Sequence, residues 1–216
     1  MHSKKKADTV EAETPFFCAR YQDFDLWFEG TGWDLQRTTA MMAGLENSRY
    51  ADICGDDIGA MDGVGWEFIA EPVCFTATHG EAGVVASAWA GPIRTEDDEI
   101  GCNLTYAVDE GYQGRSLARL LSCLAFLACD QLYRRMTFAN IESRADNHSS
   151  IALARSLGFA HYPDEDFTMP VAGSTEEVVF HCLRADMTYL RQCAYLVLKE
   201  KKLGDLLTLI QAARRR

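Results

Sequence analysis

The chain has 216 residues, of which 48% are hydrophobic, and a formal net charge of −11 at pH 7. This length is sufficient for one well-packed core with additions at either end, and the negative charge excludes a nucleic-acid partner because phosphates are repelled. The longest apolar stretch, residues 120–129, is well short of the roughly 20 residues that span a bilayer, so we expect no membrane association.

The eight cysteines form no C-x-x-C pair, and no histidine cluster has the spacing of metal ligands. We therefore expect neither a metal site nor a disulfide framework. Reduced thiols are typical of the cytosol, and the basic residues at positions 4–6 are followed by acidic residues rather than by the apolar core of a signal peptide. These features predict a cytoplasmic protein that starts with a flexible tail over residues 1–14.

The first half of the chain contains one expected helical region and three expected strands. Aromatic, leucine and methionine residues at helical spacing predict two short helices between Phe16 and Tyr50. Residues 72–78 and 83–90 are rich in strand-forming residues and are separated by His79-Gly80-Glu81, which predicts a β-hairpin. Residues 101–108 predict a third, antiparallel strand.

A strong helix follows, because leucines recur at helical spacing to about Asp130. The next strand-like run, residues 136–142, is expected to lie parallel to 101–108 through a right-handed crossover, and residues 177–183 predict a last strand. Two further apolar faces within residues 184–216 indicate a C-terminal helical extension. Its role is left open between a homodimer interface or lid and helices packed on their own sheet; we favour the last.

The run from Tyr106 to Ala118 leads from an extended segment through a short turn into the leucine-rich helix. The four N–H groups at a helix start have no partner within the helix and carry the positive end of its dipole. Small residues at Gly114, Ser116 and Ala118 let an anion approach these groups. The stretch therefore predicts a cradle for a diphosphate.

Two motifs in the correct order resemble those of one enzyme family. The run Q-G-R-S-L-A from Gln113 to Ala118 resembles the Q/R-x-x-G-x-G/A signature of the GNAT superfamily of N-acetyltransferases, with Ser116 in place of the usual internal glycine. About 30 residues later, Asn147, a short helix over residues 149–157 and the sequence Leu-Gly-Phe resemble the family's second motif. The resemblance covers roughly residues 73–183.

The resemblance implies an α/β GNAT fold, with a mixed, mostly antiparallel sheet that splays at the cofactor site and is flanked by helices. Residues 15–183 would form the acetyltransferase domain and residues 184–216 the extension. Acetyl-CoA would be the cosubstrate, with its diphosphate on the cradle amides and its pantetheine arm in the splay beside strand backbone and Asn147. The implied cofactor-binding residues are Tyr106, Ala107, Val108, Gln113, Gly114, Arg115, Ser116, Leu117, Ala118, Asn147 and Ser150.

The implied chemistry needs a base, because only a neutral amine attacks a thioester and the acceptor must first lose a proton. In relatives that take this base from the strand before the cradle, it would fall near Cys102 or Asn103, and neither can serve. The nearest carboxylates are Glu142, at the end of the parallel strand, and Glu99, which precedes the third antiparallel strand. These two are the candidate catalytic residues.

The resemblance lacks the general acid that is usual in the family. Many family members carry a tyrosine four residues before the glycine that ends the short helix, where its hydroxyl protonates the departing thiolate, and this chain has Ala154 there. The alternatives are water, Ser150, Ser156 or a residue from the N-terminal part, with Tyr112 and Tyr162 as candidates by proximity.

Two functions stay open at this stage. The first is an N-acetyltransferase that moves an acetyl group from acetyl-CoA to a primary amine of a small or peptidic acceptor by direct attack in a ternary complex. The second is a non-catalytic acyl-CoA-binding or protein-interaction module. Fourteen acidic residues against two arginines between positions 46 and 110 favour a cationic acceptor, unless they form only a solvated surface.

Overall fold

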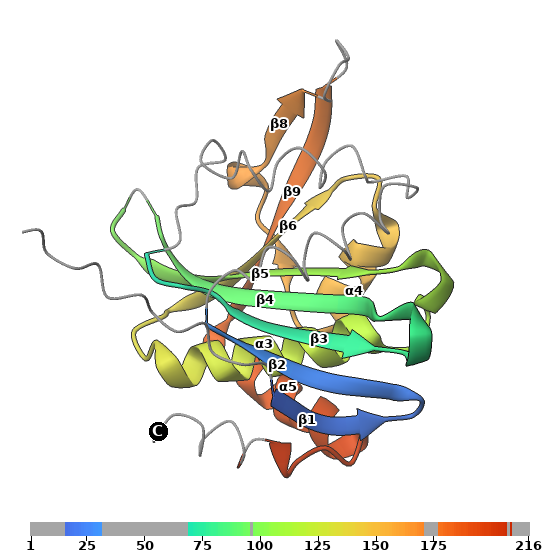
Figure 1. Cartoon of the computed structure of the whole chain (residues 1–216). Helices are drawn as coiled ribbons and strands as arrows, with labels where there is room; N and C mark the ends of the chain where they lie inside the picture. Colours follow the sequence, from blue (N-terminus) through green and yellow to red (C-terminus); the bar gives the residue numbers. More distant parts are fainter. Residues whose placement is uncertain (1–15, 32–68, 96, 171–176, 207, 209–216) are drawn as a thin grey trace, which may run out of the picture.

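The computed structural model describes residues 16–31, 69–95, 97–170, 177–206 and 208. Within them, nine strands form one sheet in the order β1-β2-β3-β4-β5-β6-β9-β7, and β8 pairs with β9 (Figure 1). The described neighbours are antiparallel apart from the parallel pair β5 and β6. The expected mixed, mostly antiparallel sheet is therefore confirmed.

The elements carry the labels of Figure 1. The strands are β1 Phe16–Tyr21, β2 Phe24–Thr31, β3 Val73–Thr78, β4 Val84–Arg94, β5 Ile100–Val108, β6 Phe138–Arg144, β7 Ala160–His161, β8 Phe167–Pro170 and β9 Glu177–Asp186. The helices are α3 Leu117–Leu132, α4 His148–Ser156 and α5 Met187–Glu200. Three short 3-10 turns are η1 Gly80–Ala82, η2 Glu110–Tyr112 and η3 Pro163–Glu165.

The prediction of helices from position 16 is wrong for residues 16–31, which form the antiparallel hairpin β1–β2. The side chains of Phe24 and Leu26 are fully buried, whereas Asp25 between them is not, so burial here follows the two-residue period of a strand. Gln22 has a φ of 56°, which lets the two-residue connection turn sharply. The remainder of the predicted helical region, residues 32–50, lies outside the described residues, as does the tail.

The other predicted elements are present. The β3–β4 hairpin closes through η1, β5 follows as the third strand, and α3 carries the chain to β6, which runs parallel to β5. Strands β7 and β8 were not predicted, because each is too short to show a periodic pattern.

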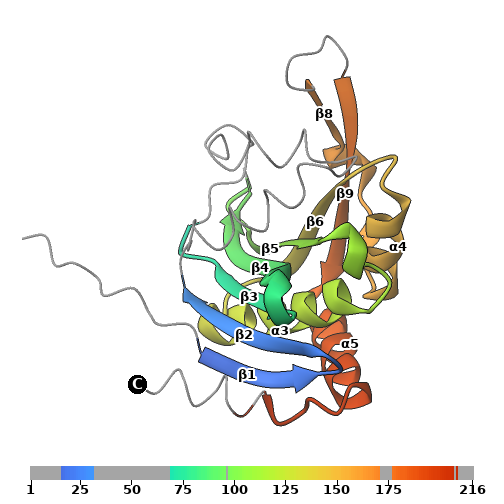
Figure 2. The ribbon, with the colours of Figure 1, turned by 45° about the vertical axis from the view of Figure 1, so that its right-hand side comes forward.

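Helices α3 and α5 lie together on one face of the sheet (Figures 1 and 2). Helix α5 begins at the N-cap Asp186, whose side chain accepts a hydrogen bond from the Tyr189 amide at 2.9 Å. It buries Leu190 and Ala194 in the same core as α3, and Arg191 forms two hydrogen bonds of 2.8 Å with Asp130 of α3. Each buried leucine contributes about 1.5–3 kcal/mol, so α5 is part of the domain core. The second apolar face of the expected extension lies largely outside the described residues.

No described helix is both long and apolar enough to cross a membrane. No disulfide joins the cysteines of the described segments.

Candidate active site

The sheet splays between its two parallel strands. Strand β5 pairs with β6 over only three positions, and the last pair is Asn103 with Asn140. Beyond it, β5 continues to Val108 on its antiparallel partner β4, while β6 continues to Arg144 on β9. The side of β5 that faces β6 therefore has no strand partner past Asn103, and its peptide groups can pair with an extended ligand as a neighbouring strand would. We call this opening the fork.

The chain turns directly from the open end of β5 into α3. The carboxylate of Asp109 accepts a hydrogen bond of 2.9 Å from the Gly111 amide and so begins η2. Gly114 and Ser116 then both adopt left-handed backbone conformations, with φ of 75° and 64°. These two positions fold the turn back over the start of α3.

The amides at the start of α3 are suited to an anion. The first backbone bond of the helix runs from the Leu120 amide to the Ser116 carbonyl at 3.0 Å, and the Ser116 side chain makes no capping bond. The preceding amides therefore have no partner within the helix, and no acidic residue lies in its first turn. A Cβ built on Gly114 would meet no atom within 4 Å, so the space above the turn is open. The geometry fits the diphosphate of acetyl-CoA.

The left-handed conformation of Ser116 explains why glycine is usual at this position. A side chain in this region costs about 1–2 kcal/mol, whereas glycine costs about 0.4–1 kcal/mol through the entropy of the unfolded chain. We expect Ser116→Gly to raise the free energy of unfolding by up to ~1 kcal/mol, with equal or tighter acetyl-CoA binding. Urea denaturation and calorimetric titration measure both quantities. A less stable variant would show that the Ser116 side chain stabilises the turn.

The side chain of Arg115 points away from the cradle. Its guanidinium lies 3.2 Å from Asp23 in the β1–β2 turn and stacks over Phe24, 5.6 Å from the ring centroid. His79 also contacts Asp23, at 3.1 Å, and the Tyr112 hydroxyl lies 3.3 Å from His79 Nδ1. Arg115 therefore ties the cradle to the β1–β2 turn, and Tyr112 contacts His79 in the β3–β4 connection.

A row of polar side chains leads from the base of the fork. The Nδ2 amide of Asn140, which is fully buried, donates to Asn103 Oδ1 at 3.4 Å and to Glu142 Oε1 at 3.3 Å. No donor among the described residues reaches Asn140 Oδ1, which leaves a buried acceptor for the N–H of a ligand. Glu142 is half-buried on the part of β6 that has left β5.

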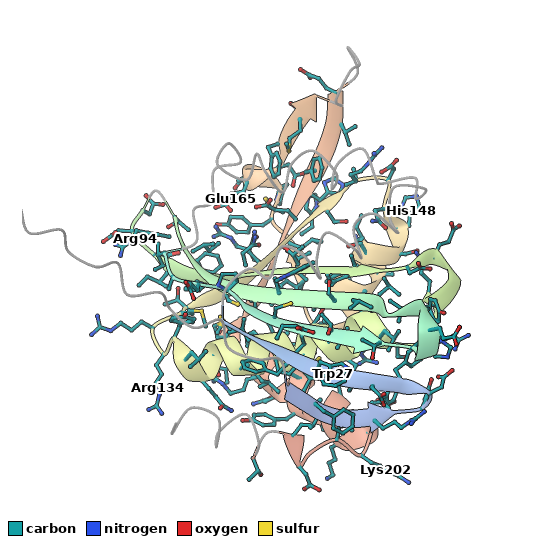
Figure 3. All side chains as sticks on the ribbon, viewed as in Figure 1. Trp27, Arg94, Arg134, His148, Glu165 and Lys202 are labelled. Carbon is teal, nitrogen blue, oxygen red and sulfur yellow. The ribbon has the colours of Figure 1, made fainter. Side chains whose placement is uncertain are left out.

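The other carboxylate candidate, Glu99, lies far from this row. It closes the exposed β4–β5 turn, where its amide donates to Thr95 Oγ1 at 3.1 Å. Figure 3 shows Arg94, at the end of β4 beside this turn, at the opposite side of the sheet from His148 at the start of α4. Glu99 is thus at the paired end of β5, not at the fork.

Helix α4 borders the other side of the fork. The Asn147 side chain caps it by accepting a hydrogen bond of 3.1 Å from the Ser150 amide. The Tyr106 hydroxyl, which comes from β5, donates to the Ser150 carbonyl at 3.2 Å and lies 2.8 Å from Ser150 Oγ. Burial raises the pKa of Tyr106 to about 12, although its hydrogen bond to Ser150 opposes this. A hydroxyl pair therefore spans the fork.

The remaining candidate acids lie elsewhere. Ala154 is fully buried one turn after Ser150, on the same face of α4, and Ser156 Oγ donates to the Leu153 carbonyl at 2.7 Å. Tyr162 is 43% exposed and lies under the Arg184 guanidinium, 4.6 Å from it. The Tyr106 hydroxyl was not predicted as a candidate, because only the docking of α4 on β5 brings it to Ser150.

The proton-carrying groups lie on opposite faces of the sheet. Tyr106 packs against the core on the α3 face. Because side chains alternate along a strand, Asn103 lies on the other face of β5. On β6, Ile141 belongs to the core, so its neighbours Asn140 and Glu142 point to the face that Asn103 shares. Glu142 and Tyr106 therefore lie on opposite faces of the sheet.

The fold and the cradle at the start of α3 define an acyl-CoA-dependent transferase, and comparisons with known proteins agree. The model of the acetyltransferase (GNAT) family matches residues 47–159, just over half of the chain. The chain belongs to the GNAT family of acetyltransferases, whose cosubstrate is acetyl-CoA. A search of curated protein sequences found no match.

Solved structures show the same fold at low sequence identity. Arabidopsis thaliana NAA60 in complex with acetyl-CoA is 12% identical with a TM-score of 0.53, over 76% of this chain and 99% of that chain. An N-acetyltransferase from Staphylococcus aureus is 15% identical with a TM-score of 0.51, over 77% and 99%. A ribosomal-protein-alanine N-acetyltransferase from Brucella melitensis is 17% identical with a TM-score of 0.50, over 72% and 97%.

Proposed function

We propose that this protein transfers an acetyl group from acetyl-CoA to a primary amine of a small or peptidic acceptor, by direct attack within a ternary complex. The observation that carries the proposal is the fork itself: pairing of β5 and β6 ends at Asn103 and Asn140, immediately before the turn that leads into α3. The fork and the cradle are therefore continuous along β5. The decisive experiment is release of free thiol from acetyl-CoA against a panel of amines.

Acetyl-CoA would be held by backbone groups. The turn from Gln113 to Ala118 would bind its diphosphate through the amides at the start of α3, and the unpaired edge of β5 at Tyr106 to Val108 would bind the pantetheine arm. The cosubstrate supplies an acetyl group activated as a thioester. Asn147 contributes by capping α4, which fixes the wall of the fork that carries Ser150.

Glu142 is the proposed base. It lies on the part of β6 that has separated from β5, on the face opposite α3, and its carboxylate accepts a hydrogen bond from Asn140. There it would accept the proton of the acceptor ammonium, whose pKa of ~10.4 for a lysine-like amine leaves it charged at neutral pH. The buried Oδ1 of Asn140 would accept a hydrogen bond from the same amine. Glu99 is not proposed, because it lies at the other end of β5.

Direct attack is favoured over an acyl-cysteine intermediate. Cys182 lies opposite Glu142 on β9. Burial raises the pKa of the Cys182 thiol to about 12, and the charge of Glu142 adds to this effect. The thiol therefore stays protonated and is a poor nucleophile.

The proposed proton donor to the departing sulfur is the hydroxyl pair of Tyr106 and Ser150. Tyr106 reaches the α4 face that also carries Ala154, so a hydroxyl from β5 takes the place of the family's tyrosine from α4. A high pKa is acceptable for this role because the Tyr106 hydroxyl must stay protonated until the sulfur leaves.

Tyr106→Phe tests this donor. We expect a loss of about 10²-fold in the single-turnover rate, within the range that general acid catalysis supplies, while the acetyl-CoA dissociation constant changes little. Tyr162→Phe is the matched control, since the Tyr162 ring packs under the Arg184 guanidinium, whereas the Tyr106 hydroxyl contacts Ser150. If Tyr106→Phe keeps the wild-type rate, water protonates the thiolate.

The acceptor is proposed to be cationic. Six described acidic side chains between positions 69 and 110 are exposed, and Asp109 is half-buried; the exposed ones are Glu71, Glu81, Asp97, Asp98, Glu99 and Glu110. The further acidic residues at 46–67 lie outside the described residues. A negative surface of this kind attracts amines to the protein. A peptidic acceptor is in keeping with the substrate named for the B. melitensis neighbour.

The salt dependence of turnover shows whether the acidic surface recruits a cationic acceptor or only keeps the protein soluble. Turnover of a cationic acceptor below its KM should fall steeply as the Debye length is reduced from about 30 Å to about 8 Å, whereas a neutral amine of similar size should respond little. Initial rates in the thiol-release assay measure both. Equal responses would assign the acidic surface to solubility alone.

A further inference from the structure

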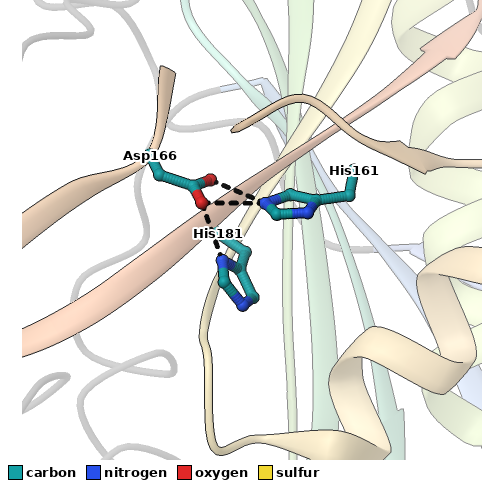
Figure 4. Close-up of side chains that lie close together, drawn as sticks. All are labelled: His161, Asp166 and His181. Carbon is teal, nitrogen blue, oxygen red and sulfur yellow. Dashed lines mark hydrogen bonds and ion pairs between the residues drawn. The ribbon is translucent and has the colours of Figure 1, made fainter. Parts of the chain in front are cut away.

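A group of three metal-ligating side chains lies on the outer edge of the sheet, outside the proposed active site. They are His161 at the end of β7, Asp166 after η3 and His181 in β9 (Figure 4). The ligand-type atoms of all three lie within 4.8 Å of one another. We propose that His161, Asp166 and His181 bind a divalent transition-metal ion, with Zn²⁺ as the ion that suits them best.

The ligand atoms converge on one point. Nε2 of His161 lies 2.8 Å from Asp166 Oδ2, and Nδ1 of His181 lies 2.9 Å from the same oxygen. The two imidazole rings are 4.3 Å apart between centroids. Two ligands bound 2.0–2.1 Å from one tetrahedral Zn²⁺ are roughly 3.3 Å apart. Small rotations of the side chains would therefore admit the ion between atoms that already face one another.

The backbone holds this arrangement in place. His161 pairs with Leu183 of β9, and the amide of Tyr162 donates to the Cys182 carbonyl at 2.8 Å. The Cys182 amide donates to Asp166 Oδ1 at 3.0 Å, which leaves Oδ2 directed at the imidazoles. All three ligands are therefore positioned on adjacent segments before any ion binds, and this lowers the entropic cost of binding.

The donor set indicates the kind of ion. Two imidazole nitrogens and one carboxylate oxygen are ligands of Zn²⁺, and three protein ligands leave a fourth position for water. The three side chains are 34%, 21% and 28% exposed, so an ion and its water have access. Binding needs neutral imidazoles whose lone pairs face the ion, so the hydrogen of each ring must lie on its other nitrogen.

The plain alternative is that two histidines simply hydrogen-bond one carboxylate. The test uses the full chain without a histidine tag, stripped of metal by a chelator and titrated with Zn²⁺ by calorimetry at pH 7.5. We expect one Zn²⁺ per chain and a melting temperature that rises with Zn²⁺, because an ion that binds only the folded state stabilises it. Bound Co²⁺ should show the visible spectrum of a low-symmetry site with nitrogen and oxygen ligands.

Three variants assign the ion to this site. His161→Gln, His181→Gln and Asp166→Asn should each weaken Zn²⁺ binding by more than ~100-fold, beyond the effect of losing an outer-shell partner. Asp166→Asn keeps an oxygen for the Cys182 amide, so it tests the charge without removing that hydrogen bond. His79→Gln is the matched control, because His79 also contacts a carboxylate, Asp23, but has no second imidazole there.

The control should bind Zn²⁺ like the wild type. Absence of Zn²⁺ binding by the wild type, or unchanged binding in all three ligand variants, would overturn the proposal and leave a hydrogen-bonded cluster. Circular dichroism of the metal-free variants shows that they are folded.

Discussion

Replacing Gly114 by glutamate is expected to abolish acetyl-CoA binding. Gly114 has a φ of 75°, where a side chain costs about 1–2 kcal/mol, so the turn would move away from its cradle geometry. The new carboxylate would lie beside the amides of α3 and repel a diphosphate by about 1–4 kcal/mol at 4 Å, depending on exposure to solvent. Since 1.4 kcal/mol is a factor of ten, calorimetry should show an affinity at least ~100-fold lower.

Gly83→Glu is the matched control for this result. Gly83 has a φ of 71° and, like Gly114, open space around an added Cβ, but it lies in the β3–β4 connection rather than in the cradle. It adds the same charge at another glycine with a positive φ, and it should bind acetyl-CoA almost as the wild type does. A folded Gly114→Glu variant with normal affinity would show that the diphosphate binds elsewhere.

Replacing Glu142 by glutamine is expected to lower kcat/KM for a cationic amine by about 10²–10⁴-fold at neutral pH, the usual contribution of a positioned base. Acetyl-CoA affinity should change little, because Glu142 lies on the face of the sheet opposite α3. The deficit should shrink as the pH rises towards the acceptor pKa of ~10.4, because the free amine then forms in solution. Steady-state rates between pH 6.5 and pH 9.5 measure this dependence.

Glu99→Gln distinguishes the two carboxylates. Glu99 lies in the exposed β4–β5 turn, so its variant should retain the wild-type rate and pH profile. An equal loss in both variants would mean that the loss reflects general surface charge. A loss in Glu99→Gln alone would place the acceptor at the other end of β5.

Sequence patterns predict the elements whose signals come from neighbouring residues. The leucine spacing of α3 and the small residues at Gly114 and Ser116 lie within about 15 positions of one another, and they predicted the helix and its cradle. The hairpin at His79 was likewise predicted from adjacent residues. These signals suffice because helix starts and tight turns are set by neighbours in the chain.

Short or mixed patterns were less informative. In β1 and β2, the aromatic residues fit the spacing of a helix as well as the alternation of a strand. The helical spacing predicts helices where the structure has strands. Pairing with β3 decides in favour of a strand, because the backbone N–H and C=O groups of β2 form their hydrogen bonds with β3. Strands β7 and β8 depend on β9 in the same way.

The geometry of the proposed site depends on contacts between distant parts of the chain. Asn103 and Asn140 are 37 positions apart and meet only because the α3 crossover makes β5 and β6 parallel. Glu142 lies on the part of β6 that has separated from β5, whereas Glu99 lies at the paired end of β5, although the sequence offered both as candidates.

The proposed metal site also depends on contacts between residues that are distant in the sequence. His161, Asp166 and His181 have no ligand spacing along the chain, and the sequence therefore indicated no metal site. The antiparallel pairing of β7 and β8 with β9 brings the three side chains to one edge. Local patterns fix helices and turns, but a site built from residues on separate strands exists only once long-range backbone hydrogen bonds set the register between those strands.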